Sequence, residues 1–208
     1  MIIVPADEQS IRQAADIIRS GGLIAYPTET YYGLGVDPYN QQALRKLFAI
    51  KKRAAHLPIL VLIADINQAE RLAVLPLPKS FTRLALQFWP GPLTLVCPAR
   101  PELAPELTGG TATIGMRQSS HHVAQQLVQV FGRPITATSA NLSGGAPANT
   151  AAQVASFFGQ GIDIILDGGE TPGTKGSTLV KCEHESIECI RQGMIDFQTI
   201  KENNLSWL

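Results

Sequence analysis

The chain has 208 residues, of which 45% are hydrophobic and 16% are charged, and its formal net charge is zero. This length fits one domain, and the apolar content is too high for a disordered chain. No apolar run approaches the roughly 18 residues of a membrane span, and the N-terminus lacks the pattern of a signal peptide. We therefore expect a cytoplasmic protein without membrane segments.

The charges are unevenly distributed along the chain. Residues 38–101 carry nine basic and two acidic side chains. A basic sector on a neutral chain suits a local anionic ligand, although a solvated helix face explains the same asymmetry.

The cysteines point to a reducing compartment. Cys97, Cys182 and Cys189 are odd in number and have no CxxC spacing. This pattern argues against a disulfide scaffold and against a zinc site.

Strands alternate with helices through most of the chain. The first helix is predicted from apolar residues at helical spacing between Ile11 and Ile18. The predicted strands are residues 1–4, 23–26, 59–63, 93–97, 113–117, 135–138, 162–166, 177–181 and 186–191, with an extended loop at 31–36. The further predicted helices are residues 41–51, 66–72, 79–88, 120–131, 150–158 and 196–203. The order predicts one α/β domain over residues 1–208, with a mixed sheet whose last two strands pair locally.

Four segments carry more polar and small residues than a plain core needs, namely residues 27–35, 51–53, 113–117 and 136–145. Most of them lie at predicted strands, and ligands gather where loops leave the carboxyl ends of strands in open α/β sheets. An ordinary strand exit is an alternative explanation of the first segment, and a Gly/Ser-rich loop is an alternative explanation of the last.

The cations in these segments have two interpretations. Lys51, Lys52 and Arg53 end a predicted helix, where they either meet the helix dipole or bind phosphate. Arg117 ends an apolar strand and is costly to bury unpaired, so that it needs a carboxylate or phosphate partner from the protein or a ligand.

Other chemistries are disfavoured. His121 and His122 are adjacent on a predicted helix and point in different directions, which disfavours a metal site. The sequence contains neither a P-loop nor a GxSxG nucleophile motif. The residues alone indicate an anion-binding α/β protein.

Seven motifs occur together and in order: YPTETYYGLG (26–35), IKKR (50–53), FWPGPLTLV (88–96), TIGMR (113–117), TSANLSGG (138–145), GSTLV (176–180) and IRQG (190–193). With them the chain resembles the YrdC-like family of L-threonylcarbamoyladenylate synthases, in its short single-domain form. The resemblance implies a twisted α/β fold with a deep, basic, concave cavity. It also implies synthesis of threonylcarbamoyl-AMP from L-threonine, bicarbonate or CO₂, and ATP, with release of pyrophosphate. Partner proteins would then transfer the threonylcarbamoyl group to adenosine 37 of tRNA.

The resemblance assigns roles to residues of this chain. The catalytic signature falls on Lys51, Arg53, Ser139 and Asn141. L-Threonine is expected at Thr28, Arg117, Ala137 and Ser177, with Arg117 pairing with its carboxylate. ATP is expected at Lys51, Arg53, Thr113, Ser139, Asn141, Pro147 and Arg191. Mg²⁺ is expected to bind the ATP phosphates without a protein metal site, and proton removal from the threonine amine is left to solvent or bicarbonate.

The chain departs from the family pattern in one region. Ala54 replaces a usual Pro, residues 57–59 read Leu-Pro-Ile where Asn-Pro-Leu is usual, and Leu62 replaces a common His. We expect any difference in substrate choice or turnover to arise there.

Two alternative functions remain open at this point. One is an RNA-binding module of the same fold, holding tRNA or double-stranded RNA without catalysis, which the basic sector motivates. The other is a diverged carbamoyl or nucleotide enzyme acting on another small acid. Trp207, in an apolar C-terminal tail, is expected to dock on the core or on a neighbour.

Overall fold

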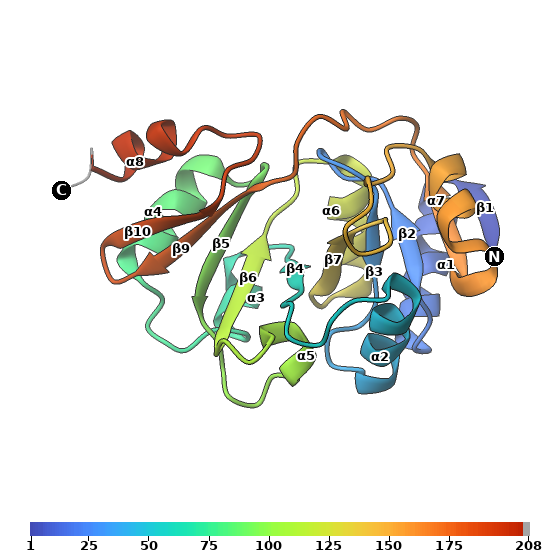
Figure 1. The fold of residues 1–208 in the computed structure, drawn as a ribbon, viewed down its shortest axis with the longest axis horizontal. Coiled ribbons are helices and arrows are strands. Elements are labelled where there is room, and N and C mark those ends of the chain that lie inside the picture. Colours follow the sequence, from blue (N-terminus) through green and yellow to red (C-terminus); the bar gives the residue numbers. More distant parts are fainter. Residues whose placement is uncertain (206–208) are drawn as a thin grey trace.

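A computed structural model describes residues 1–205. Ten strands form a sheet in the order β1-β8-β2-β3-β7-β4-β6-β5-β9-β10 (Figure 1). They are β1 (Ile2–Pro5), β2 (Ile24–Tyr26), β3 (Gly33–Gly35), β4 (Leu60–Leu62), β5 (Leu93–Pro98), β6 (Thr113–Arg117), β7 (Ile135–Ser139), β8 (Ile164–Asp167), β9 (Thr178–Glu183) and β10 (Ser186–Arg191). Parallel pairs such as β4–β6 and antiparallel pairs such as β5–β6 occur together. The predicted α/β fold with a mixed sheet is confirmed.

The predicted helices are present with small shifts of their ends. They are α1 (Glu8–Arg19), α2 (Gln41–Lys51), α3 (Ile66–Glu70), α4 (Lys79–Phe88), α6 (His122–Phe131), α7 (Ala151–Phe158) and α8 (Phe197–Leu205). The sequence did not predict α5 (Pro105–Thr108) or a 3₁₀ turn at Gly159–Gly161. α5 is a single turn between Pro105 and Gly109, too short to show helical periodicity.

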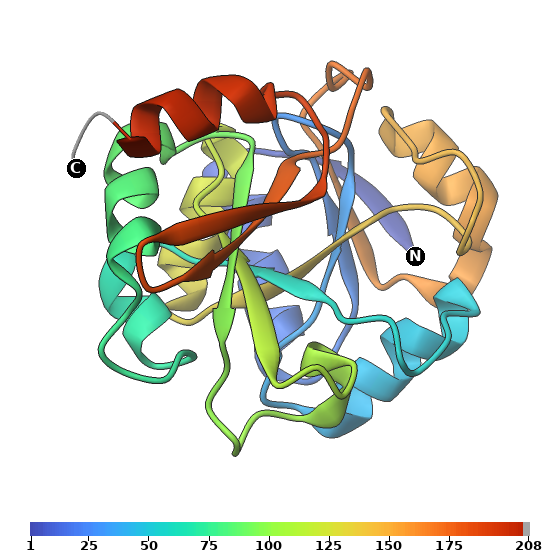
Figure 2. The same ribbon diagram turned by 60° about the vertical axis from the view of Figure 1, so that its left-hand side comes forward.

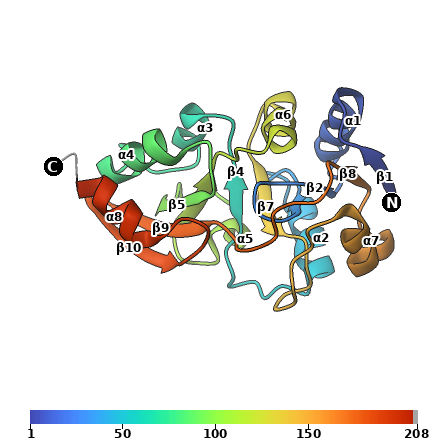
Figure 3. The same ribbon diagram turned by 90° about the horizontal axis from the view of Figure 1, so that it is seen from above.

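Helices cover both faces of the sheet. Figure 3 shows α1, α6, α3 and α4 along one side, and α2 and α7 on the other. Alternate residues of each central strand face opposite sides: Ile24 and Tyr26 of β2 pack with α1 and α6, whereas Ala25 belongs to the larger core on the other face. This alternation is the period of two that a sheet buried on both faces requires.

Local sequence signals set the helix ends. Asp7 and Asn40 accept hydrogen bonds from the backbone N–H groups of Ser10 and Ala43, which caps the N-termini of α1 and α2. At the other end of α2, Lys52 adopts a left-handed conformation with φ 49°. This residue ends the helix, so that Arg53 leaves it in a new direction.

The chain finishes with a hairpin and a helix. β9 and β10 pair antiparallel and form one edge of the sheet, next to β5, and Figure 2 shows α8 beside α4. The three cysteines are free thiols. No helix within residues 1–205 combines the length and apolar character that crossing a membrane requires. The interpretation of Trp207 falls outside the described residues.

Candidate active site

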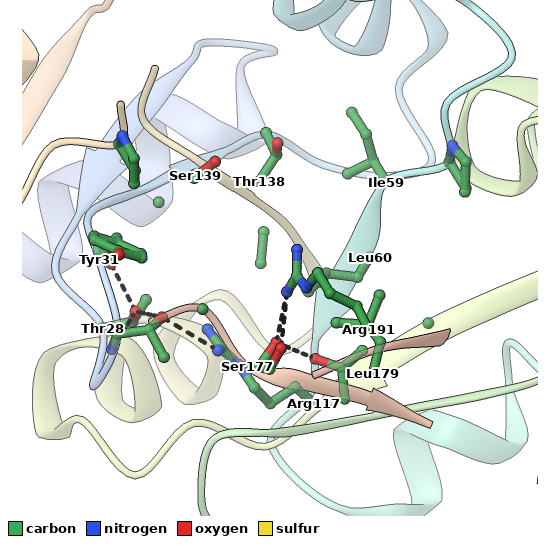
Figure 4. A pocket seen from close by; sticks show the side chains of 18 of the residues that line it. Thr28, Tyr31, Ile59, Leu60, Arg117, Thr138, Ser139, Ser177, Leu179 and Arg191 are labelled. Atoms are coloured by element: carbon green, nitrogen blue, oxygen red, sulfur yellow. Dashed lines mark hydrogen bonds between the residues drawn. The ribbon is translucent and has the colours of Figure 1, made fainter. Parts of the chain in front are cut away.

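A cavity of about 620 Å³ is lined by the β2–β3 loop, by β5, β6 and β7, and by the β9–β10 hairpin (Figure 4). Its volume lies in the usual range for small-molecule sites. The charged residues that line it are Arg53, Arg117, Lys175 and Arg191. Among the described residues, no Asp or Glu side chain lines the cavity. The expected concave basic cavity is therefore present, and its charge suits an anionic ligand.

Hydroxyl groups of the β2–β3 loop lie beside Arg117. Thr28 Oγ1 donates to the carbonyl oxygen of Tyr31 at 2.6 Å and lies 3.0 Å from Thr30 Oγ1 (Figure 4). Arg117, the last residue of β6, is 4% exposed, and its Nη1 donates to Thr30 Oγ1 at 3.4 Å. The sequence left the partner of Arg117 open. The structure provides a protein carboxylate, because Glu29 Oε1 lies 3.5 Å from Arg117 Nη1.

A second guanidinium group, that of Arg191, lies against Ser177 on the cavity wall (Figure 4). Arg191 Nη2 donates to the Ser177 carbonyl oxygen at 2.8 Å and to its Oγ at 3.4 Å. Ser177 Oγ also shares a hydrogen bond of 2.8 Å with Thr94 Oγ1 on β5 (Figure 4). Burial, and to a smaller extent the charge of Arg117, lower the pKa of Arg191. Two guanidinium groups close enough to repel each other favour an anion between them.

The backbone at the end of β10 is irregular, because a bulge interrupts its pairing with β9. The β9–β10 register shifts between Cys189 and Arg191, so that the adjacent residues Ile190 and Arg191 both line the cavity. Two residues later, Gly193 passes directly over the start of β9. A Cβ atom on Gly193 would lie 2.4 Å from the Gly176 carbonyl oxygen and from the Ser177 carbonyl carbon. Only glycine fits there without displacing Ser177.

Lys51 lies behind the cavity wall and not on it. Its side chain is 1% exposed, and Nζ donates to the carbonyl oxygens of Ser139 and Asn141 at 2.5 and 2.7 Å and to Asn141 Oδ1 at 3.4 Å. All three ammonium protons therefore have protein acceptors. Burial, together with the charge of Arg53, lowers the pKa of Lys51 to about 7.

Ser139 and Asn141 form a fixed turn after β7. Ser139 Oγ donates to Asn141 Oδ1 at 2.5 Å, and Asn141 Nδ2 donates to the carbonyl oxygens of Leu142 and Gly145 at 2.8 and 2.7 Å. The backbone N–H of Ser143 donates to the Lys51 carbonyl oxygen at 2.9 Å. The turn is thus held to the end of α2 through both the backbone and the ammonium group of one lysine.

Arg53 lines the cavity next to this turn and holds the segment that departs from the family pattern. Its Nε and Nη2 donate to the carbonyl oxygens of Leu57 and Pro58 at 3.2 and 2.7 Å. Burial lowers the pKa of Arg53. Of the departures, Ile59 lines the cavity, next to Pro58, which keeps the family pattern; Leu57 does not line it. Leu62 belongs to the core packed with α1 and α6, and Ala54 is exposed; neither lines the cavity.

The structure brings the sequence-predicted site residues together from distant parts of the chain. Except for Lys51, each of them lines the cavity: Thr28, Arg53, Thr113, Arg117, Ala137, Ser139, Asn141, Pro147, Ser177 and Arg191. The sequence analysis did not single out several other lining residues: Thr30, Tyr31, Thr94, Thr111, Lys175 and Gln192. Most of these lie inside or beside the seven motifs, and that position is the signal that would have found them.

His121 and His122 lie next to each other at the start of α6. The rings of His121 and His122 stack with their centroids 4.9 Å apart, and His121 Nδ1 accepts the hydrogen bond of the Val123 N–H. Burial, and then the neighbouring His122, lower the pKa of His121. Across residues 1–205, no group of three or more His, Cys, Asp or Glu side chains is placed to hold a metal ion.

Residues 16–193 match the family model of Sua5, YciO and YrdC proteins, which carries the description "Telomere recombination". The chain belongs to this family. It is 37% identical over 190 residues to the threonylcarbamoyl-AMP synthase of Photobacterium profundum, covering 88% of this chain and 99% of that protein. It is 39% identical over 196 residues to the threonylcarbamoyl-AMP synthase of Pyrococcus abyssi, covering 94% of this chain. These matches confirm the family resemblance of the seven motifs.

Two solved structures share the fold of this Sua5/YciO/YrdC chain. P. abyssi Sua5 complexed with L-threonine superposes with a TM-score of 0.93 at 38% identity, over 98% of this chain and 61% of the other. E. coli YciO gives a TM-score of 0.83 at 25% identity, over 93% and 94%. The chain spans about 57% of the length of the P. abyssi synthase and 56% of that of the Bacillus subtilis synthase.

Proposed function

We propose that the chain is a threonylcarbamoyl-AMP synthase. In this reaction L-threonine and bicarbonate or CO₂ form a carbamate, and a carbamate oxygen attacks the α-phosphorus of ATP. The bond between the α- and β-phosphates breaks, and pyrophosphate leaves. The observation that carries the proposal is the cavity itself, which has four cationic lining residues and no described acidic one. Such a site suits two small anions and a nucleotide better than a neutral metabolite.

The two sides of the cavity suit the two substrates. On one side, the hydroxyl group of Thr28 and the guanidinium group of Arg117 lie close together, next to Thr30. We assign the threonine carboxylate to Arg117, because a guanidinium group binds a carboxylate through two parallel hydrogen bonds. Thr28, Ser177 and the backbone at Ala137 complete the proposed amino-acid site. A relative that was crystallised with L-threonine, P. abyssi Sua5, supports L-threonine as the amino-acid substrate.

The ATP site is proposed on the opposite side, around the turn after β7. Arg53, Thr113, Ser139, Asn141, Pro147 and Arg191 line the cavity there or at its junction with the threonine site. Arg53 and Arg191 supply positive charge for the phosphates, which is where negative charge accumulates as pyrophosphate leaves. We assign Lys51 to the same site as a residue that holds the Ser139–Asn141 turn, because its donors are all occupied by that turn.

Catalysis in this proposal rests on position and charge. Holding the carbamate oxygen in line with the α-phosphorus removes most of the entropic cost of the encounter. A covalent nucleophile is not required, because the carbamate itself attacks. No described carboxylate lines the cavity, so we propose that Mg²⁺ is bound through the ATP phosphates, whose charge it would neutralise. Solvent or bicarbonate is proposed to take the proton of the threonine amine.

The product would be passed on to other proteins. We propose that tRNA-modifying transferases take the threonylcarbamoyl group from the adenylate and place it on adenosine 37 of tRNA. A cytoplasmic location is proposed with it, in keeping with three unpaired cysteines.

The test is product formation by the full chain. The protein is incubated with ATP, Mg²⁺, bicarbonate and L-threonine, and threonylcarbamoyl-AMP is sought by mass spectrometry in complete mixtures and in mixtures lacking one substrate. The proposal predicts product only in the complete mixture. Absence of product together with tight retention of tRNA at physiological salt would instead favour an RNA-binding protein.

A further inference from the structure

Glu29 is a buried carboxylate that lies against the proposed threonine site without lining it. It follows Thr28 in the β2–β3 loop, and its side chain is 12% exposed. Its Oε1 is 3.5 Å from Arg117 Nη1, and its Oε2 accepts a hydrogen bond from Ser119 Oγ. Neither Glu29 nor Ser119 is among the residues that line the cavity, whereas Arg117 is. The carboxylate therefore supports Arg117 from the protein side.

The end of β6 holds this carboxylate at two points. Arg117 and Ser119 are two residues apart, and both reach Glu29, one through charge and the other through a hydrogen bond. Ser119 is 2% exposed, and its Oγ also accepts the hydrogen bond of the His121 N–H at 3.2 Å. Glu29 is thus fixed by a hydroxyl group that is itself fixed by the start of α6.

Hydrogen bonding at Arg117 is incomplete. Arg117 Nε and Glu29 Oε1 are buried and have no hydrogen-bond partner among the described residues. Within residues 1–205, the hydrogen bond of the Arg117 side chain runs from Nη1 to Thr30 Oγ1. A buried guanidinium group whose N–H donors lack acceptors destabilises the folded protein unless a ligand completes its hydrogen bonds. Since Arg117 lines the cavity, an anionic ligand there can supply acceptors for its guanidinium group.

We propose that Glu29, held by Ser119, is a positioning residue that orients the Arg117 guanidinium group toward the carboxylate of the amino-acid substrate. This inference rests on the proposed function and deepens it. Glu29 touches no substrate: it acts through Arg117. The pairing of Glu29 with Nη1 leaves the other edge of the guanidinium fork for the substrate, and that geometry is lost when the carboxylate is neutralised.

The test compares Glu29→Gln with wild type in steady-state kinetics and in calorimetric binding of L-threonine. The substitution retains the shape of the side chain and removes its charge, so we expect the KM and the Kd for L-threonine to rise about tenfold, with the KM for ATP unchanged. Glu185→Gln is the matched control, because it removes the carboxylate of an exposed ion pair with Lys79 that does not line the cavity. We expect this control to behave as wild type.

A substrate analogue separates positioning from general damage. L-Threoninamide lacks the carboxylate, so wild type is expected to bind it far less tightly than L-threonine. In Glu29→Gln the ratio of the Kd for L-threoninamide to the Kd for L-threonine should fall about tenfold, because the substitution weakens only the interaction with the carboxylate. Ser119→Ala keeps the Glu29 charge and is used if Glu29→Gln fails to fold; a smaller rise in the L-threonine Kd, of about threefold, is expected there.

Several outcomes would overturn the inference. An unchanged Kd for L-threonine in a folded Glu29→Gln or Ser119→Ala variant would do so. A lower Kd would also do so, because it would mean that Glu29 chiefly repels the substrate carboxylate. Equal rises in the KM for ATP and for L-threonine would indicate general loss of structure and would likewise overturn it. If wild type itself neither binds L-threonine nor forms product, the proposed function fails, which is a separate result.

Discussion

The ammonium group of Lys51 lies 2.7 Å from the carbonyl oxygen of Asn141, and both residues are buried. This contact joins the C-terminus of α2 to the turn that follows β7, although the two segments are 90 residues apart in the chain. The turn carries Ser139 and Asn141 on the wall of the cavity. Lys51 thus shapes the proposed nucleotide site from behind.

Replacing Lys51 should therefore damage stability and ATP binding together. Lys51→Met keeps the aliphatic stem but leaves the carbonyl oxygens of Ser139 and Asn141 without their donor, so the free energy of unfolding should fall by about 2 kcal/mol. Urea unfolding and the KM for ATP are the measurements. Lys52→Met is the control, since Lys52 is exposed and does not line the cavity. Equal behaviour of the two variants would refute the role given to Lys51.

The same lysine should make stability depend on pH. Burial lowers its pKa in the folded state from the ordinary 10.5 to about 7. Between these values the unfolded chain binds a proton that the folded chain does not, so this residue's contribution to stability rises with pH. The free energy of unfolding of wild type should therefore increase relative to that of Lys51→Met as the pH rises from about 7 to about 10. A constant difference over that range would contradict the lowered pKa.

Arg117 should not be replaceable by lysine. A lysine retains the positive charge but has no planar fork, so Arg117→Lys should raise the KM for L-threonine by more than about tenfold and leave the KM for ATP nearly unchanged. Arg12→Lys is the matched control, because Arg12 forms an exposed ion pair with Glu8 on α1. Full threonine affinity in Arg117→Lys would remove Arg117 from the amino-acid site.

Gly193→Ala should reduce activity through Ser177. The new methyl group would lie 2.4 Å from backbone atoms of Gly176 and Ser177, so that the start of β9 must move. We expect a loss of about 2 kcal/mol in stability and a marked fall in turnover. Gly132→Ala tests the specificity of this effect. Gly132 has φ 78° but no atom within 4 Å of an added Cβ, so this change costs about 1 kcal/mol in stability and leaves turnover intact.

Thiol labelling checks the packing of the β5–β9 region. Burial raises the pKa values of Cys97 and Cys182 to about 12, whereas Cys189 is partly exposed on β10. An aromatic disulfide reagent should modify one thiol quickly in the folded protein and all three after unfolding. Rapid modification of the other two thiols in the folded state would contradict the packing described.

The sequence allowed most of this architecture to be predicted, because its strands and helices have strong periodic patterns. It also allowed most lining residues to be predicted from motifs. The place of Lys51 was not predicted, although the signal was present: Leu44, Leu47, Phe48 and Lys51 follow the i, i+3, i+4, i+7 spacing of one helix face, and that face is buried. Glu29 lies inside one of the seven motifs and Lys175 directly before another, but the ion pair of Glu29 with Arg117 joins segments distant in sequence, which no local pattern predicts.

The central claim is that the cation-lined cavity makes threonylcarbamoyl-AMP. Pyrophosphate release from ATP, followed with and without L-threonine and bicarbonate, tests it most directly. The account predicts release that requires both co-substrates, matches the amount of threonylcarbamoyl-AMP formed, and is lost in Arg117→Ala while the fold is retained. Pyrophosphate release that is independent of L-threonine, or undiminished in Arg117→Ala, would contradict it.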